Sequence, residues 1–310
     1  MPKKIIFMGI PLFAVPILKS LYQNGFPISV VFTQPPQKSH RGQRINKSPI
    51  QGISETLNID FRTPQSLKNN NEEYEFIKDL NADLCITVAF GQIIPKEFLS
   101  LTKKGFINIH ASILPKWRGA APIQRSIMNL DTETGISIMK MNEELDSGPI
   151  CNTYKIKLDQ SLNAQEVSEQ LSLLAADKIL DNVDDILDGK SNFVDQDHSK
   201  STYAKKILKG EGQIDWSNDA LKIIGIINGL YPFPGAFFNF NGERYKILKA
   251  ETGNRIGKIG EVVSDNLEIA CGTNKSIKIL EIQREGKKVQ KVGEFMLGSQ
   301  IRKGSVITNV

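Results

Sequence analysis

Cysteine, tryptophan and histidine are scarce in this chain of 310 residues, which has three, two and three of them respectively. The cysteines, Cys85, Cys151 and Cys271, stand far apart, and no pair has the spacing of metal ligands. Their odd number argues against the disulfide framework of a secreted protein. The histidines are equally scattered, so no two of them form a helical metal-binding pair. We therefore expect neither a disulfide framework nor a metal site.

Long hydrophobic runs are also missing. The apolar run near the start is stopped by Gly9 and Pro11, and it is too short for a signal peptide. No later stretch approaches the ~20 apolar residues that a membrane-spanning helix needs. We therefore expect a cytoplasmic protein with no membrane partner.

The common nucleotide and hydrolase motifs are absent as well. Gly9-Ile10-Pro11 lacks the second and third glycines of a dinucleotide-binding turn. The chain also has no phosphate-loop lysine motif and no Gly-x-Ser-x-Gly nucleophile elbow. These absences argue against a nicotinamide-dependent dehydrogenase.

What the chain does have is a globular composition, with 40% hydrophobic and 24% charged residues and a mean hydropathy of −0.23. Apolar strands alternate with helices through the first 189 residues. Strands are expected at 4–8, 28–33, 83–90, 106–109, 135–141 and 150–158, and helices at 13–23, 49–57, 74–80, 122–130 and 163–187. This alternation predicts an α/β domain with a Rossmann-like, mostly parallel sheet that lacks the dinucleotide fingerprint.

The character of the sequence changes after residue 189. Residues 190–207 are polar and read as a linker. Beyond them we expect a helix at 218–229 and short strands at 236–239, 244–250, 257–263, 267–270, 277–283 and 288–292. This rhythm predicts a small OB-like β-barrel over 208–310. That region holds 15 Lys and Arg against 11 Asp and Glu, which accounts for +4 of the chain's net charge of +5 and hints at a polyanionic partner.

The densest chemical signal is the segment that follows the strand at 106–109. Alternation places Asn108 and His110 on the same side of that strand, and ligands of open α/β sheets bind beyond the carboxyl ends of the strands. Polar side chains on an otherwise apolar strand need partners. Taken alone, this pattern still favours a structural histidine at position 110, and Asp146 in its tight turn reads as a turn cap.

Together the three residues suit acyl transfer to an amine. The tetrahedral intermediate of such a reaction carries a negative oxygen, which preorganised hydrogen-bond donors stabilise. The Asn108 amide and a protonated His110 are both donors, and the nearby Asp146 carboxylate would orient the imidazole and favour its charged form. No Ser or Cys nucleophile is required if the amine attacks directly.

The chain resembles the 10-formyltetrahydrofolate-dependent formyltransferases over nearly its whole length. The resemblance lies in Asn108-x-His110, the stretch 112–122 (SILPKWRGAAP), Asp146, and segments 32–35, 88–95 and 231–236. It is strongest to the members that formylate methionyl-tRNA. One departure is that Ile10 and Leu12 stand where the family usually has polar residues.

The resemblance implies that the α-amine of initiator methionyl-tRNA attacks the formyl carbon of 10-formyltetrahydrofolate, which is a co-substrate here. It implies catalysis by Asn108, His110 and Asp146. It also implies a reduced-folate site, in which main-chain groups line the pterin pocket, at Phe90, Gly91, Gln92, Ile93, Ser112, Leu114, Pro115 and Met139. On the same basis residues 1–189 are the catalytic domain, and 208–310 are a basic domain that binds tRNA by charge. We expect the protein to be a monomer.

The segment 34–48 is basic, and we expect it to be a loop. It carries Lys38, Arg41-Gly42, Arg44 and Lys47, with no acidic residue before Glu55. Loops of this length are usually functional or mobile. In the family a matching loop with an Arg-Gly pair enters the acceptor end of tRNA, so these residues are expected to bind tRNA, whereas the plain alternative is a solvated loop.

A rival interpretation keeps the chemistry and changes the acceptor to a nucleotide-linked amino sugar. The basic loop and the basic second domain argue against it. A ribonucleotide formyltransferase would not need the second domain, and a non-catalytic binding module would not need the three catalytic side chains.

Overall fold

The structure of the chain is a computed structural model that describes residues 3–39 and 44–308. The chain divides into two compact units. The first unit combines residues 1–119, 135–156 and 168–203, and the second combines 120–134, 157–167 and 204–310. The predicted domain boundaries at 189 and 208 remain predictions.

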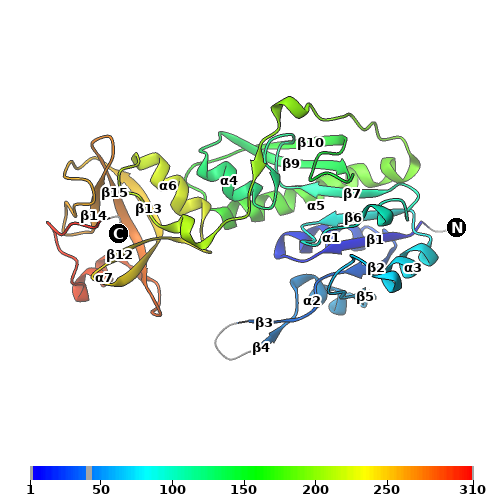
Figure 1. Cartoon of the computed structure of the whole chain (residues 1–310), viewed down its shortest axis with the longest axis horizontal. Coiled ribbons are helices and arrows are strands. Elements are labelled where there is room, and N and C mark those ends of the chain that lie inside the picture. The colour runs from blue at the N-terminus through cyan, green and yellow to red at the C-terminus, as the bar shows by residue number, and fades with distance from the viewer. Residues whose placement is uncertain (1–2, 40–43, 309–310) are drawn as a thin grey trace. The chain divides into compact units, whose positions relative to one another are not determined.

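The first unit is built on a seven-stranded sheet in the order β10-β9-β7-β6-β1-β2-β5 (Figure 1). Its strands are β1 (Ile5–Gly9), β2 (Ile28–Phe32), β5 (Phe61–Arg62), β6 (Leu84–Val88), β7 (Phe106–His110), β9 (Glu133–Lys140) and β10 (Ile150–Lys157). The neighbours from β5 to β7 pair in parallel, and β9 pairs with β7 in the antiparallel sense. The predicted mostly parallel α/β sheet is confirmed.

Helices follow the strands as the apolar spacing predicts. They are α1 (Val15–Gln23), α2 (Pro49–Thr56), α3 (Asn71–Leu80), α4 (Pro122–Met128) and α5 (Ala164–Asp188). Three of them begin with a side-chain cap, and in α5 the Asn163 Oδ1 accepts from the Glu166 N–H at 3.1 Å. The Ser48 side chain accepts a hydrogen bond from the Gln51 N–H at the start of α2, and Asn70 does the same for the Glu73 N–H in α3.

Both faces of the sheet are buried. Ile6 and Met8 of β1 lie in one apolar cluster with Ile77 of α3. Alternation turns Ile5 and Phe7 of the same strand to the opposite face, and these side chains are also fully buried. Burial on both faces explains why the strand reads as a continuous apolar run.

Part of the segment 34–48 is not the plain loop that the sequence predicts. β3 (Gln37–Ser39) and β4 (Arg44–Asn46) pair as antiparallel strands, with Lys38 opposite Ile45 and Ser39 opposite Arg44. Their polar and basic composition shows no apolar alternation, so the sequence gives no strand signal there. We call the β3–β4 pair the basic hairpin. A smaller pair joins β8 (Arg118–Gly119) to β11 (Tyr203–Ala204).

The second unit holds the antiparallel sheet of the C-terminal half-barrel. Its strands are β12 (Ala236–Phe240), β13 (Glu243–Gly253), β14 (Glu268–Cys271), β15 (Lys275–Arg284) and β16 (Gln290–Lys291). They are ordered β12-β13-β15-β14, and β16 also pairs with β15. Trp216, Phe238 and Tyr245 form the aromatic part of the core, with ring centroids 6.0 and 5.5 Å apart in the two neighbouring pairs.

Helix α6 (Ala220–Gly229) joins this core and packs closely against α4. A Cβ atom on Gly229 would lie 2.5 Å from Met128 Cγ, so the glycine allows the two helices to approach. The Lys222 ammonium donates a hydrogen bond to Met128 O at 3.0 Å, which satisfies a carbonyl at the end of α4.

Two predicted barrel strands are wrong in extent. Residues 257–263 make only isolated bridges, because Gly260 has a φ of +79° and lies against the backbone of Ile307. Residues 288–292 contain the short β16 and then the start of α7 (Val292–Gly298). Two glycines make α7 a poor helix by propensity, but Phe295 is buried and packs edge-on against Tyr245.

Among the described residues, every helix is too short or too polar for a membrane crossing.

Candidate active site

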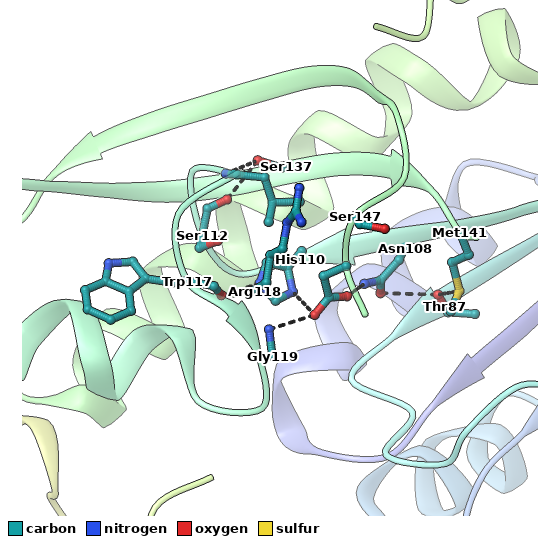
Figure 2. Close-up of polar contacts among 12 residues, drawn as sticks. Thr87, Asn108, His110, Ser112, Trp117, Arg118, Gly119, Ser137, Met141 and Ser147 are labelled. Carbon is teal, nitrogen blue, oxygen red and sulfur yellow. Dashed lines mark hydrogen bonds and ion pairs between the residues drawn. The ribbon is translucent and has the colours of Figure 1, made fainter. Parts of the chain in front are cut away.

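Asn108, His110 and Asp146 meet at the middle of the first unit's sheet. Asn108 and His110 lie two residues apart in the last part of β7 and face the same side, as alternation predicts. Asp146 comes from the segment between β9 and β10 and has a left-handed backbone, with φ +48°. Figure 2 shows the contacts that bring Asn108 and His110 to this carboxylate.

The Asp146 carboxylate contacts three groups. Its Oδ1 accepts a hydrogen bond from the Asn108 amide nitrogen at 3.2 Å. Its Oδ2 accepts one from the Gly119 N–H at 2.9 Å and lies 3.6 Å from His110 Nδ1, which is an ion-pair distance. The His110 and Asp146 side chains are only 7% and 13% exposed, so water screens this contact weakly.

His110 lies between two acceptors. Its Nε2 contacts the Trp117 carbonyl oxygen at 2.9 Å, while Nδ1 faces Asp146. A carbonyl oxygen only accepts, so Nε2 carries a hydrogen, and a second hydrogen on Nδ1 would serve the carboxylate. The Trp117 indole points away from His110, so that residue serves the histidine through its backbone (Figure 2).

Thr87 lies opposite Asn108 in the neighbouring strand β6. The single hydrogen of its hydroxyl has three acceptors within reach: Ile107 O at 3.1 Å, Asn108 Oδ1 at 3.2 Å and Met141 Sδ at 3.2 Å. The Asp146 carboxylate only accepts, so the amide nitrogen of Asn108 must face it, and the amide oxygen faces Thr87. The second N–H of the Asn108 amide has no partner among the residues that the structure describes. This donor is therefore available to a ligand.

Gly148 allows the Asp146 turn to close on β9. A Cβ atom at this position would lie 1.9 Å from the Lys140 carbonyl oxygen, which belongs to the backbone and cannot move aside cheaply. The next residue, Pro149, accepts a hydrogen bond from the Lys140 N–H at 2.8 Å.

The residues predicted to bind folate fall on both sides of Asn108. Phe90–Ile93 follow β6, which is one neighbour of β7, and Met139 lies opposite Asn108 in β9, which is the other. The Gln92 side chain donates to Pro64 O at 2.9 Å. Ile93 is 83% exposed, whereas Phe90 and Met139 are buried.

The segment after β7 is closed by its own hydrogen bonds. The buried Ser112 hydroxyl donates to Lys116 O at 2.6 Å, and Leu114 N donates to Ser137 Oγ at 3.1 Å. Pro115 follows a cis peptide bond. These hydrogen bonds fix the course of the backbone directly after His110.

The structure places only some of the residues predicted to bind tRNA. Lys38 and Arg44 stand in β3 and β4. Arg41 and Gly42 lie outside the described residues. Lys47 follows the hairpin and forms an ion pair with Glu55 at 2.9 Å, and this hydrogen bond lowers the pKa of the Glu55 carboxyl.

Sequence reasoning missed three supporting groups: the Thr87 hydroxyl, the Gly119 N–H and the Trp117 carbonyl. Thr87 left a signal, because it is a polar residue in an apolar strand at the same register as Asn108. The other two are backbone groups, which no pattern of side chains in the sequence can predict.

Comparisons with known proteins fit this geometry. A family model described as formyl transferase matches residues 3–183, and one described as its C-terminal domain matches residues 206–300. A methionyl-tRNA formyltransferase of Pelagibacter ubique (strain HTCC1062) is 65% identical over 310 residues, which is 100% of both chains. The chain belongs to the methionyl-tRNA formyltransferase family. Another relative of this name, from Chelativorans sp. (strain BNC1), is 39% identical and covers 99% of this chain and 100% of its own.

Solved structures share the fold at lower identity. The N-formyltransferase of Helicobacter canadensis in complex with folinic acid and dTDP-3-aminofucose has a TM-score of 0.71 and 19% identity, covering 92% of this chain and 100% of its own. WlaRD, a sugar 3N-formyl transferase, has a TM-score of 0.68 and 19% identity, covering 93% and 100%. The fold is thus common to enzymes with different acceptors, and the full-length relatives in the methionyl-tRNA formyltransferase family separate this chain from the sugar enzymes.

Proposed function

We propose that this chain transfers the formyl group of 10-formyltetrahydrofolate to the α-amine of initiator methionyl-tRNA, with Asn108, His110 and Asp146 as its catalytic residues. One observation carries the mechanism: the Asp146 carboxylate contacts the Asn108 amide, the Gly119 N–H and the His110 ring together. The choice of acceptor rests on the full-length relatives, which are named methionyl-tRNA formyltransferases.

The donor supplies an electrophilic formyl carbon, and attack by the amine moves negative charge onto the formyl oxygen. The free N–H of Asn108 donates to that oxygen, and the positive ring of His110 stabilises it at short range. Both His110 nitrogens contact protein acceptors, so the ring acts through its charge in this arrangement. A direct N–H contact would require it to leave one of them.

Asp146 has two tasks in this mechanism. It keeps the Asn108 amide and the His110 ring in place, and it assists the movement of the amine proton toward the leaving folate nitrogen. The amine attacks directly, so no covalent enzyme intermediate forms. The three thiols are unsuited to attack in any case, because burial raises the pKa of Cys151 and Cys271 to about 11 and raises the pKa of Cys85 as well.

The surroundings of Asn108 fit a reduced folate. Ile93 and Leu145 are apolar side chains that are 83% and 61% exposed, and each lies in a segment next to the catalytic trio. Exposed apolar groups beside fixed backbone groups suit a flat heterocycle, because such sites combine apolar walls with a few placed polar atoms. We propose that the main chain of Phe90–Ile93 and Met139, with the wall formed by Ser112, Leu114 and Pro115, holds the folate.

The charge distribution supports a polyanionic acceptor. Lys38, Arg41-Gly42, Arg44 and Lys47 belong to or flank the basic hairpin, and we propose that they contact the acceptor end of tRNA. In the second unit, Lys209, Arg244 and Lys246 line a surface pocket of about 290 Å³. We propose that these cations bind phosphates, a contact that orients RNA without reading its sequence.

We also propose that the protein acts as a monomer in the cytoplasm, where charged tRNA and reduced folate are both present. Light scattering tests the first point. A mass near 34.6 kDa supports a monomer, and twice that mass contradicts it.

A direct test of the acceptor compares methionyl initiator tRNA with a dTDP-linked amino sugar under one set of conditions. We expect formyl transfer to the tRNA and none to the sugar nucleotide. Transfer to the sugar alone would keep the catalytic mechanism and overturn the choice of acceptor.

A further inference from the structure

Two buried polar side chains, Arg118 and Gln196, lie beside the active site and have no part in the mechanism above. They are 78 residues apart in sequence and only 2% and 6% exposed. Arg118 Nε and Nη2 donate to Gln196 Oε1 at 3.1 and 2.7 Å. Gln196 lies in the polar stretch 190–207, where the sequence predicts only a linker.

Gln196 donates two hydrogen bonds to the main chain of the turn that contains Asp146. Its amide nitrogen donates to Asp146 O at 2.9 Å and to Gly148 O at 2.7 Å, so both N–H groups are used. Asp146 has a left-handed backbone, which is unfavourable for a residue other than glycine unless the surroundings hold it. Gln196 supplies that support through the main chain of the turn.

Arg118 sets the direction of the Gln196 amide. A guanidinium only donates and a carbonyl only accepts, so Oε1 must face Arg118 and Nε2 must face the turn. The far end of the guanidinium also contacts His198 Nδ1 at 3.3–3.4 Å. Arg118 is next to Gly119, whose N–H donates to the Asp146 carboxylate.

We propose that Arg118 and Gln196 are positioning residues that hold the Asp146 carboxylate between Asn108 and His110. This inference rests on the proposed function. Neither side chain needs to touch a substrate. Their effect on the rate passes through the place of Asp146.

The first test is Gln196→Glu beside Gln196→Ala. The glutamate keeps an acceptor for Arg118 but loses both N–H donors to the turn. If the donors matter, Gln196→Glu lowers kcat by about ten- to a hundredfold, as misplacement of a catalytic group does, while KM for both substrates stays within about threefold. Gln170→Glu, the same change on an exposed face of α5, should leave kcat unaltered. Wild-type kcat in Gln196→Glu would overturn the proposal.

A double-mutant cycle with Asp146→Asn separates positioning from general weakening of the fold. If Gln196 acts through Asp146, adding Gln196→Glu to Asp146→Asn lowers the single-turnover rate by less than about threefold. If the two effects multiply, Gln196 acts by another route and the proposal fails.

Arg118→Lys is the second variant. The lysine keeps the positive charge but cannot donate two hydrogen bonds from a planar guanidinium to Gln196 Oε1. We expect it to lower kcat in the wild-type background and to have little further effect in Asp146→Asn.

A measurement without turnover distinguishes this proposal from the proposed function. The Asn108 side-chain amide donates to Asp146, so its ¹⁵N–¹H resonances should shift in Gln196→Glu and stay in place in Gln170→Glu. Unmoved resonances would overturn the positioning role even in an enzyme that formylates methionyl-tRNA. A wild-type chain without transfer activity, but with the shifted resonances in the variant, would overturn the proposed function and keep the positioning role.

Discussion

At the scale of single residues, the site depends on Asp146, whose few oxygen atoms contact several neighbouring groups at once. Asp146 uses two oxygens for Asn108, Gly119 and His110, and its own carbonyl is held by Gln196. A group with this many fixed partners loses little orientation freedom when a substrate binds. Such preorganisation is where most electrostatic stabilisation of a transition state arises.

Replacing His110 or Asp146 should therefore lower the rate and spare the fold. For His110→Ala and Asp146→Ala we expect kcat to fall by roughly 10²–10⁴-fold, the range seen when acid–base and oxyanion groups are removed. Single-turnover formyl transfer measures this, and unchanged far-ultraviolet circular dichroism shows that the variants are folded. Turnover near the wild-type rate in either variant would contradict the mechanism.

Gly148→Ala tests the closure of the Asp146 turn. The added methyl would lie 1.9 Å from the Lys140 carbonyl oxygen, so the turn must shift and carry Asp146 with it. We expect a loss of about 1–3 kcal/mol in unfolding free energy, as overpacking typically costs, together with a lower kcat. Urea unfolding and transfer assays measure the two effects. Gly52→Ala is the control, because outside its chain neighbours and the backbone of its own helix no described atom lies within 4 Å of the added group.

The trio could be predicted from the sequence because each member is a side chain in a recognisable motif. Asn108 and His110 share a strand face by alternation alone, whereas placing Asp146 beside them required the family resemblance. Gln196 could not be predicted, since a glutamine in a polar stretch gives no local sign of burial. Its role exists only in the contacts that it makes with residues 48–78 positions away.

At the scale of elements, strands and helices with apolar faces were predicted well and polar ones were not. β1, β6 and β7 read as apolar runs because both faces of their sheet are buried. The basic hairpin was missed because its polar strands carry no apolar alternation. Helix α7 was missed because it depends on tertiary contacts of Phe295 and has little helix propensity of its own.

Phe295→Ala tests that account of α7. The ring is buried and packs against Tyr245 at a centroid distance of 5.7 Å, so its removal leaves a cavity in the core of the second unit. We expect the unfolding free energy to fall by about 3–5 kcal/mol. Denaturant unfolding measures the change. Leu297→Ala, on the exposed side of the same helix, should have an effect within about 0.5 kcal/mol.

Arg41 lies between β3 and β4 in the sequence, and we propose that it contacts the tRNA. Arg41→Ala should raise KM for methionyl-tRNA and leave folate binding unaltered, because its proposed contact is with the RNA acceptor end. Steady-state kinetics with each substrate varied in turn measure the two effects. Equal kinetics in the variant and the wild type would remove Arg41 from tRNA recognition.

At the scale of the whole molecule, charge rather than shape argues for a nucleic-acid substrate. Most of the net charge of +5 lies after residue 207, and three cations line one pocket of the second unit together with Glu285. The Lys246 side chain packs over Gly235, where an added Cβ atom would lie 2.4 Å from Lys246 Cδ. Burial, together with the nearby Arg244, lowers the pKa of the Lys246 ammonium. A polyanion that binds here would supply the opposite charge that this ammonium needs.

Lys246→Ala should therefore weaken tRNA use without affecting the chemical step. We expect a higher KM for methionyl-tRNA, an unaltered kcat, and a salt dependence of log KM that is shallower by about one unit for each phosphate that the variant no longer binds. Titrating salt in steady-state assays measures the slope. Lys19→Ala, an exposed lysine of α1, is the matched control, and an equal effect of both substitutions would contradict a specific phosphate site at Lys246.

The central claim is tested most directly by formyl transfer from 10-formyltetrahydrofolate to purified initiator methionyl-tRNA, measured in single turnovers at low and at moderate salt. The account predicts rapid transfer that weakens as salt rises, because Asn108, His110 and Asp146 carry the chemistry and the basic surfaces hold the RNA. An absence of transfer to this tRNA at either salt concentration would contradict it.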